Sequence, residues 1–467
     1  MLFSSIPFLY YFLPIVFLVY FAVPKSFKNF VLLVASLFFY GCGEPKYLIL
    51  MSVSILIGYG GGLLTGHAQK KGTKRVFLTL SVVLLAGLLG YFKYADFFIA
   101  NFNALTGLSL PLLRVTLPIG ISFYTFQILS YVIDVYRGDT PAQKNLITFA
   151  AYVSMFPQLI AGPIVRYTDV QKEIGARAHS VSSAYAGMQR FICGLAKKVI
   201  LADTAGVLAK KYMEADPAAL PALAAWLGSL MYIVQLYFDF SGYSDMAIGL
   251  GRIFGFRFPE NFNYPYISKS VSEFWRRWHM TLGSFFRDYV YIPLGGNRRH
   301  VYFNLLIVWL LTGFWHGASW NFIFWGLYNG VFIALERVLR KPFERLPAFI
   351  RHIYLILVVD IGFVFFYFRD IGRAFSYLGA MFRAETFINT DLSVTFMNNI
   401  FFIAAAFLLC APISQSLSRF AARLENSSAF WTGTVSLIRG IALAAILAVC
   451  TALLAGNSYS PFLYFQF

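Results

Sequence analysis

The chain has 467 residues, of which 59% are hydrophobic and only 13% are charged, and its formal net charge is +17. A soluble domain cannot bury that much apolar surface, so the composition excludes an ordinary globular protein and predicts an all-α polytopic membrane protein. The basic residues are dispersed among apolar stretches and form no continuous patch. We therefore expect a lipid bilayer as the surroundings of the chain and no nucleic-acid partner.

Residues 1–110 consist of successive apolar segments with little chemistry, which predicts scaffold helices. The first of these segments, 7–23, has no basic region before it and no small-residue cleavage site, so we expect a retained helix. Loops rich in Lys and Arg stay in the cytoplasm, and this places 24–29 and 66–75 on that side. The N-terminus is then predicted outside, together with 43–46. Apolar stretches that span, or nearly span, a bilayer occur near 7–23, 30–42, 47–64, 76–92, 117–136, 145–161, 184–209, 222–250, 302–313, 319–339, 353–369, 393–413 and 434–455.

The segment 111–340 carries most of the polar chemistry of the chain, and Asp239 and Asp245 are its first notable pair. They are six positions apart, so they do not share a helix face and do not form an acid–base pair. This spacing favours a structural role for each aspartate, through a bond to Tyr, Ser or Arg of a neighbouring helix. Between them, Ser241 and Gly242 are expected to loosen the helix, which would let backbone groups line a cavity.

Residues 271–291 show the most regular pattern, with apolar side chains alternating at spacings of four and three, as on one continuous α-helix. A second face carries Arg276, His279, Gly283 and Arg287. Glu273 precedes Arg277 by four residues, the favourable order for a helical ion pair. Two interpretations remain open: an interfacial helix that contacts lipid phosphates, or a site in which His279 and the Arg side chains bind a phosphorylated ligand. The Gly-rich turn at 293–300 should bring this helix next to the following one.

His316 is the one side chain between residues 301 and 335 that titrates near neutral pH. Imidazole serves as proton acceptor, proton donor or nucleophile, and an ionisable group at membrane depth is first a candidate functional site. The alternative is a neutral histidine that is hydrogen-bonded between helices. Small and hydrogen-bonding neighbours favour a cavity wall: Trp315, Gly317, Ser319, Trp320 and Asn321.

The segment 341–467 returns to plain apolar stretches and ends in an aromatic tail. The four cysteines lie in apolar segments without the spacing of metal ligands, and no nucleotide-binding motif occurs, so we predict no metal site and no ATP-driven pump. The tail residues Phe462, Tyr464, Phe465 and Phe467 allow two interpretations. They form an interfacial belt that holds the last helix in register, or they place the Tyr464 phenol where it accepts an acyl group.

Four motifs together resemble the membrane-bound O-acyltransferase family: YFDFSGYSDM at 237–246, FWRRWH at 274–279, YIPLGG at 291–296 and GFWHGASWN at 313–321. The match is most similar to the bacterial alginate O-acetyltransferase type and covers essentially the whole chain. This resemblance implies one domain, 1–467, built as a helical bundle around a central funnel, with re-entrant or interfacial helices. The same resemblance implies a bacterial inner-membrane enzyme, with 1–110 as scaffold, 111–340 as catalytic core and 341–467 as C-terminal helices.

The resemblance also implies a reaction. An acetyl group would pass from cytoplasmic acetyl-CoA, a substrate rather than a bound cofactor, across the membrane for O-acetylation of an extracytoplasmic polysaccharide. An acetyltransferase- or esterase-like partner protein outside the membrane would complete the transfer. Related systems carry D-alanyl groups from a carrier protein, and this is one alternative for the present chain. A non-enzymatic transporter of acyl groups or polymer is the other.

The residues of the family's motifs receive roles by position. His316 aligns with the near-universal histidine and His279 with the second motif histidine. We predict His316 as general base toward a hydroxyl on Tyr464, held neutral by its apolar surroundings, with His279 or Asn321 polarising the thioester carbonyl or orienting His316. The alternative is that His316 takes the acyl group itself. The donor site is predicted to comprise Arg276, Arg277, Arg287, Trp275, Trp278 and Trp315.

Overall fold

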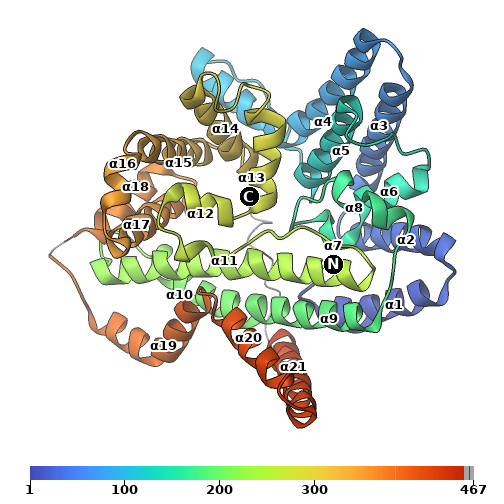
Figure 1. The fold of residues 1–467 in the computed structure, drawn as a ribbon. Coiled ribbons are helices and arrows are strands. Elements are labelled where there is room, and N and C mark those ends of the chain that lie inside the picture. The colour runs from blue at the N-terminus through green and yellow to red at the C-terminus, as the bar shows by residue number, and fades with distance from the viewer. Residues whose placement is uncertain (384, 457–461, 463–467) are drawn as a thin grey trace. The chain divides into compact units, whose positions relative to one another are not determined.

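The computed structural model describes residues 1–383, 385–456 and 462, and it is built from helices, with no strand among these residues. Figure 1 follows the helices in chain order. The chain groups into two compact units. Unit 1 comprises Met1–Phe191 and Tyr243–Glu260, and unit 2 comprises Ile192–Gly242 and Asn261–Phe467. The predicted three-part division of one domain stays a prediction.

Unit 1 contains the N-terminal helices, and in Figure 1 the helices α3, α4 and α5 run side by side. Its helices are α1 (Leu13–Ala22), α2 (Lys28–Gly41), α3 (Leu48–His67), α4 (Lys71–Thr106), α5 (Ile121–Arg137), α6 (Leu146–Ser154), α7 (Phe156–Leu159) and α8 (Tyr167–Gly175). Two further helices contribute residues to both units: α9 (Val181–Ala196) and α11 (Ala222–Ile253).

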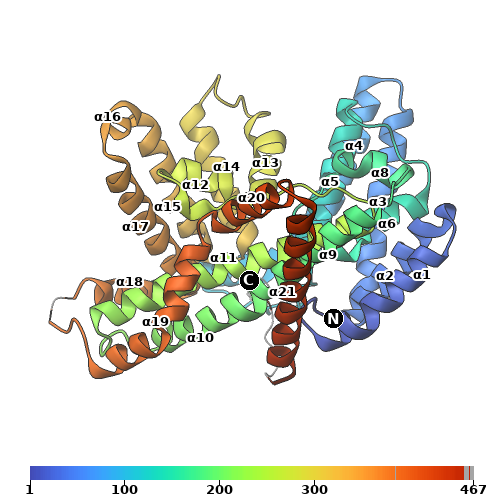
Figure 2. The ribbon, with the colours of Figure 1, turned by 60° about the horizontal axis from the view of Figure 1, so that its bottom comes forward.

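Unit 2 contains the two predicted catalytic histidines. Its helices are the π-helix η4 (Lys197–Ala202), α10 (Asp203–Met213), α12 (Val271–Arg277), α13 (Met280–Phe286), the π-helix η6 (Arg287–Tyr291), α14 (Val301–His316), α15 (Trp320–Val338), α16 (Arg340–Arg345), α17 (Ala348–Tyr367), α18 (Ile371–Met381), α19 (Thr390–Leu409), α20 (Ile413–Glu425) and α21 (Ala429–Gly456). Figure 2 shows α20 between α19 and α21 and turned away from the direction of α21.

Within the described part of the chain, six helical segments are long and apolar enough to cross a membrane: Pro45–His67, Lys71–Thr106, Ala222–Ile253, Ala348–Tyr367, Thr390–Leu409 and Ala429–Gly456. Phe8–Ala22 and Val301–His316 are shorter apolar helices. The predicted all-helical, multi-pass membrane protein is therefore confirmed. Several of the apolar stretches that the sequence offered as spans are short or partly buried within the protein instead.

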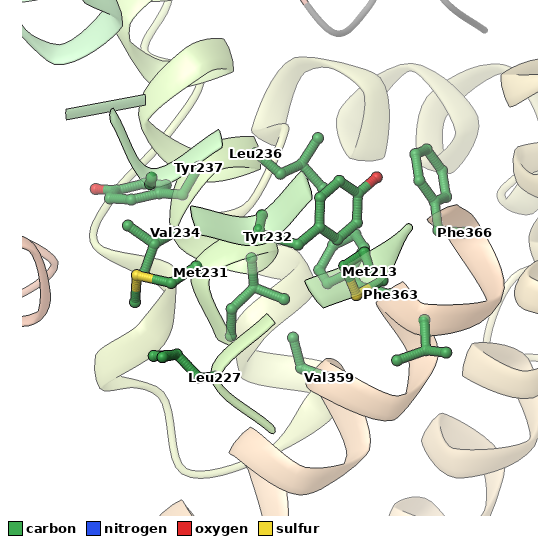
Figure 3. Packing of buried hydrophobic residues seen from close by; sticks show 14 of the residues in the cluster. Met213, Leu227, Met231, Tyr232, Val234, Leu236, Tyr237, Val359, Phe363 and Phe366 are labelled. Carbon is green, nitrogen blue, oxygen red and sulfur yellow. The ribbon is translucent and has the colours of Figure 1, made fainter. Parts of the chain in front are cut away.

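The core of unit 2 forms where α11 packs against α17. Figure 3 shows Tyr232 of α11 directed toward α17, which carries Val359 and Phe363, with Met213 of α10 beside it, while Met231 points to the other side of α11. All of these side chains are buried. Burying apolar and aromatic side chains from three helices in this way fixes α11 and α17 as the base on which α12, α14 and α15 are packed.

Helix α11 continues without interruption through Ser241 and Gly242, so the predicted loosening of the helix at this point is wrong. Gly242 has a packing function instead. A Cβ atom on it would lie 2.7 Å from the carbonyl oxygen of Gly194 and 3.1 Å from the side chain of Lys197. Only glycine permits this close crossing of α11 with the end of α9, because there is no side chain to separate the two backbones.

Candidate active site

His279 lies at a break between two short helices. The sequence predicts one helix over 271–291, but α12 ends at Arg277, α13 begins at Met280, and the backbone of His279 is left-handed with φ 44° and ψ 52°. The single amphipathic helix is therefore wrong, and Arg276, His279 and Arg287 do not share one helical face. A left-handed backbone at a residue other than glycine costs on the order of 1–3 kcal/mol and persists where surrounding contacts impose it.

Asn261 supplies those contacts. Its carbonyl oxygen accepts a hydrogen bond from the Met280 amide at 2.9 Å, and the Asn263 amide donates to the Arg277 carbonyl at 2.9 Å. The Asn261 side-chain Oδ1 accepts from Thr281 Oγ1 at 2.8 Å and from the Thr281 amide at 3.4 Å. The same oxygen lies 3.0 Å from Nδ1 of His279. One buried asparagine thus contacts His279 at the break and the first two residues of α13.

The other ring nitrogen of His279, Nε2, is buried and has no hydrogen-bond partner within the described part of the chain. Phe240 lies edge-on to the imidazole with ring centroids 4.7 Å apart, and Trp315 lies 5.9 Å away. Burial lowers the pKa of His279 to about 3, because the charged imidazolium is poorly solvated there. The ring is therefore neutral at physiological pH, with its orientation set by Asn261 and two aromatic walls.

His316 is the last residue of α14 and is half-buried. Its ring packs edge-on against Trp325 and Phe366, each with centroids 5.1 Å away, and against Trp315 at 4.9 Å. Trp315 therefore contacts both catalytic candidates, His279 on one side and His316 on the other. The structure places the two predicted histidines around one indole ring, and the motif that carries His316 does lie next to the helical break that carries His279.

Close packing of α14 on α15 positions His316. A Cβ atom on Gly313 would lie 2.2 Å from the Phe322 carbonyl oxygen, and one on Gly326 would lie 2.3 Å from the Trp309 carbonyl oxygen. Both contacts are to backbone, which cannot move aside as a side chain can. The two glycines bring the helices together near the histidine, so the small residues around His316 serve helix packing.

Asn321, the other predicted polar residue near His316, is fully buried at the start of α15. Its amide nitrogen donates to the Phe365 carbonyl at 3.2 Å, and its Oδ1 accepts from the Ser319 hydroxyl. These bonds tie the start of α15 to α17. A role in orienting His316 or polarising a carbonyl stays a prediction.

The predicted donor residues occupy different environments. Arg276 is exposed. Arg277 forms the predicted ion pair with Glu273 at 3.0 Å and also donates to the Asn263 carbonyl, so that pairing is confirmed. Arg287 pairs with its neighbour Asp288 at 2.6 Å.

The three predicted tryptophans are part of the packing. Trp275 Nε1 donates to Asn329 Oδ1 at 3.0 Å, and its ring packs against Trp309 and Trp325. Trp278 is buried among the aromatic side chains of the unit 2 core. Trp315 separates the histidines, as described. Whether any of these tryptophans or the three arginines binds the acyl donor stays a prediction.

The intramembrane aspartates have structural partners, in line with their predicted role. Asp245 accepts two hydrogen bonds from the guanidinium of Arg190, at 2.9 and 2.8 Å. In unit 2, Asp239 pairs with the buried ammonium of Lys198 at 2.7 Å, and Asp203 pairs with the same ammonium at 2.8 Å. Lys198 lies in the apolar stretch 184–209, where the sequence predicts no role for it, and only its tertiary contacts distinguish it from its neighbours.

The aromatic tail reaches this ion group. Phe462 is 1% exposed, and its ring centroid lies 4.8 Å from Lys198 Nζ. An ammonium at that distance over a ring face makes a favourable cation–π contact. Tyr464, the predicted acyl relay, lies outside the described residues.

The family model of membrane-bound O-acyltransferases matches residues 141–379, which include Asn261, His279 and His316. The chain belongs to this family. It is 40% identical over its full length, and over the full length of the relative, to a probable alginate O-acetylase of Azotobacter vinelandii. It is 34% identical to a peptidoglycan O-acetyltransferase of Helicobacter pylori, over 100% of this chain and 98% of that protein. A teichoic acid D-alanyltransferase of Bacillus subtilis is 30% identical over 53% of this chain and 67% of its own length.

Membership of the family makes the chain an O-acyltransferase, so the prediction of an enzyme is confirmed. Sequence reasoning found both motif histidines but missed Asn261, which lies in a loop 18 positions before His279 and has no periodic pattern around it. The signal that was available was weak: an asparagine directly before an aromatic and a proline-containing turn, in a chain whose polar residues are few.

Proposed function

We propose that this membrane O-acyltransferase takes an acetyl group from acetyl-CoA on the cytoplasmic side and passes it across the membrane for O-acetylation of an extracytoplasmic polysaccharide. The observation that carries the proposal is the pair of imidazoles around Trp315 in a chain whose full-length relatives are named as O-acetylases. Two neutral or half-buried imidazoles in an apolar site are suited to moving one proton during acyl transfer.

Coverage favours acetyl over D-alanyl transfer. The acetylating relatives match this chain from end to end, whereas the D-alanyltransferase of Bacillus subtilis matches about half of it. A carrier protein needs a docking surface that a small thioester does not need. The polysaccharide acceptor follows from the names of the same relatives, alginate for one and peptidoglycan for the other.

The chemistry requires few steps. The hydroxyl oxygen of the acceptor attacks the thioester carbonyl carbon, an imidazole takes the hydroxyl proton, and the C–S bond breaks. The CoA thiolate then takes that proton and leaves as the thiol. In this proposal the acceptor within the protein is the Tyr464 phenol, and the ester it forms is passed to an acetyltransferase- or esterase-like partner outside the membrane. The exposed Arg276 and the paired Arg277 and Arg287 are the proposed contacts for the donor phosphates.

The test is incubation of the purified full chain in lipid nanodiscs with acetyl-labelled acetyl-CoA, followed by mass spectrometry of the C-terminal peptide. The expected result is acetyl label on Tyr464 and release of free CoA. D-alanyl carrier protein, used in parallel, should give no label. Labelling from the carrier and not from acetyl-CoA would overturn the proposed donor, and turnover without label on Tyr464 would overturn the relay.

His316→Ala should lower the rate of CoA release by about 10²–10⁴, the usual contribution of a group that takes part in acid–base catalysis. Removing the half-buried ring leaves a cavity, so size-exclusion chromatography and thermal unfolding must show that the variant is still folded. A folded His316→Ala protein with near-normal turnover would contradict a catalytic role for this histidine.

A further inference from the structure

The bonds made by Asn261 determine which nitrogen of His279 carries the proton. A backbone N–H can only donate, and the Thr281 amide points at the Asn261 side-chain atom that also faces His279. That atom must therefore be the carbonyl oxygen of the amide and not its NH₂ group. An oxygen without a hydrogen can bond to Nδ1 of His279 only if Nδ1 carries the proton.

A neutral imidazole has one proton on its two nitrogens. With that proton on Nδ1, the Nε2 atom has a lone pair and no hydrogen. Nε2 is also the buried atom that lacks a hydrogen-bond partner in the part of the chain that the structure describes. Such an atom accepts a proton or a hydrogen bond from a ligand, and it cannot donate one to a carbonyl oxygen.

We propose that Asn261 is a positioning residue that fixes His279 in the Nδ1–H form, so that Nε2 of His279 accepts the proton of the acceptor hydroxyl. This inference rests on the proposed acyl transfer and deepens it. As the hydroxyl oxygen bonds to the thioester carbon, its proton moves to Nε2, and the imidazolium then protonates the departing CoA thiolate. His279 is thereby removed as a polariser of the thioester carbonyl, and that role passes to another donor. The sequence assigned the proton acceptor to His316, and the two assignments give different results for variants of His279.

The first experiment compares His279→Gln with His279→Ala in the labelled acetyl-CoA assay. Gln offers an N–H donor but no basic nitrogen. If His279 accepts a proton, His279→Gln should be as inactive as His279→Ala. If His279 polarises the carbonyl, His279→Gln should retain much of the wild-type kcat, and that outcome would overturn the proposal.

The second experiment tests Asn261 itself with two variants of similar size. Asn261→Leu removes the acceptor oxygen, so kcat should fall about 10- to 100-fold, by analogy with the loss of a hydrogen-bond partner that orients a metal-bound histidine, while KM for acetyl-CoA changes little. Asn261→Asp keeps the oxygen and adds a charge that stabilises the imidazolium. It should restore turnover at high pH and move the acid limb of the kcat/KM profile to higher pH.

The pH shift is read as a difference between variants, because other titratable groups around His279 are common to all of them. On the helices that flank His279 or pack against it, these groups are Glu273 and Arg277 on α12, which pair with each other, Asp239 on α11, which pairs with Lys198, and His316 on α14. An asparagine with only a structural role would lose activity alike in Asn261→Leu and Asn261→Asp, without a shift of the acid limb. That result would contradict the proposal.

A measurement on the unmodified protein does not depend on turnover. In protein labelled with ¹⁵N-histidine, the resonance that disappears in His279→Gln should have the signature of a protonated Nδ1 and an unprotonated Nε2. The opposite tautomer would overturn the inference even if acetyl transfer is demonstrated. Failure of wild-type protein to use acetyl-CoA, with the expected tautomer present, would instead count against the proposed function.

Discussion

Lys198 forms ion pairs with Asp203 and Asp239 in a place where charges are costly to bury. The group lies next to Phe462, the only residue of the aromatic tail that the structure describes. The Lys198 side chain is 3% exposed and that of Asp239 is 4% exposed, while Asp203 is 25% exposed. A buried ammonium repays its lost hydration only through close partners, and here two carboxylates lie within 2.8 Å. Phe462 covers the same ammonium. The tail and the polar motif of α11 thus share one cation.

Lys198→Met should destabilise the protein by about 3–5 kcal/mol, because it leaves the Asp239 carboxylate buried without its counter-ion. The measurement is thermal unfolding of the detergent-solubilised protein. Adding Asp239→Asn should recover part of the loss, since an amide is neutral. Lys210→Met is the matched control, because the Lys210–Glu214 pair is exposed and 3.8 Å long, so its loss should cost no more than about 0.5 kcal/mol. Equal losses of stability in Lys198→Met and Lys210→Met would show that the buried ion pair stabilises the protein no more than the exposed one.

Helix α12 depends on a contact from another helix. The Glu336 carboxylate of α15 accepts hydrogen bonds from the amides of Val271 and Ser272, at 2.5 and 2.9 Å, and from the Ser272 hydroxyl at 2.7 Å. It therefore caps the N-terminus of α12, where unpaired amides and the helix dipole favour a negative charge. Because α12 leads directly to His279, this cap also holds the helix that ends at the break.

Glu336→Gln should lower stability by about 1–3 kcal/mol, since one acceptor oxygen becomes an NH₂ group that faces donors in a buried site. Turnover should fall as well, because the start of α12 is released. Glu344→Gln serves as control, since its pair with Arg340 is exposed. The two variants are compared by melting temperature and by the initial rate of CoA release. If Glu336→Gln matches the control in both measurements, the cap does not hold α12.

The crossing of α14 and α15 tests the role of glycine near His316. Gly326→Ala places a methyl group 2.3 Å from a backbone oxygen of Trp309, so the helices must separate. We expect a loss of about 1–3 kcal/mol, as for other overpacked sites, together with reduced turnover. Gly379→Ala in α18 has nothing within 4 Å of the new methyl group and should be neutral or slightly stabilising. Thermal unfolding of both variants measures the difference. A stable, active Gly326→Ala protein would show that the helix crossing accommodates a methyl group.

The sequence predicted the features that depend on local pattern or on a motif. These include the helical class, the Glu273–Arg277 pair and the proximity of His279 to His316. It failed where a distant segment decides the local conformation. The apolar stripe of 271–291 continues in register across the break, so nothing in the pattern predicts the left-handed backbone of His279. Asn261 imposes that break, and a tertiary contact of this kind has no periodic signal.

Gly242 illustrates the same limit. A serine–glycine pair weakens a helix by propensity, and on that basis we predicted a loosened segment. The structure has a continuous helix, because the close crossing with the end of α9 repays the lost propensity through packing. A Ser–Gly pair has the same local propensity whether it breaks a helix or packs against a neighbouring helix. Only the presence of a second backbone beside Gly242 decides which of the two occurs.

At the scale of the whole molecule, direction across the membrane determines whether the proposed transfer runs from cytoplasm to exterior. Helix α3 separates two exposed positions within unit 1: Cys42, at the end of α2, and Lys70, just before α4. The segment Pro45–His67 between them is apolar and long enough to span once, so the two positions should face opposite sides. From the basic residues near Lys70 we predict that its side is the cytoplasm.

Labelling with a membrane-impermeant maleimide checks this orientation. One variant keeps Cys42 and replaces the other three cysteines with serine, and a second replaces all four and carries Lys70→Cys. In intact spheroplasts Cys42 should be labelled, and the cysteine at position 70 should be labelled only after the membrane is opened. Both should react fully in the opened membranes, which controls for buried or oxidised thiols. The reverse pattern would place the basic loops outside. It would then contradict the proposal that the arginines of α12 and η6 bind acetyl-CoA from the cytoplasm.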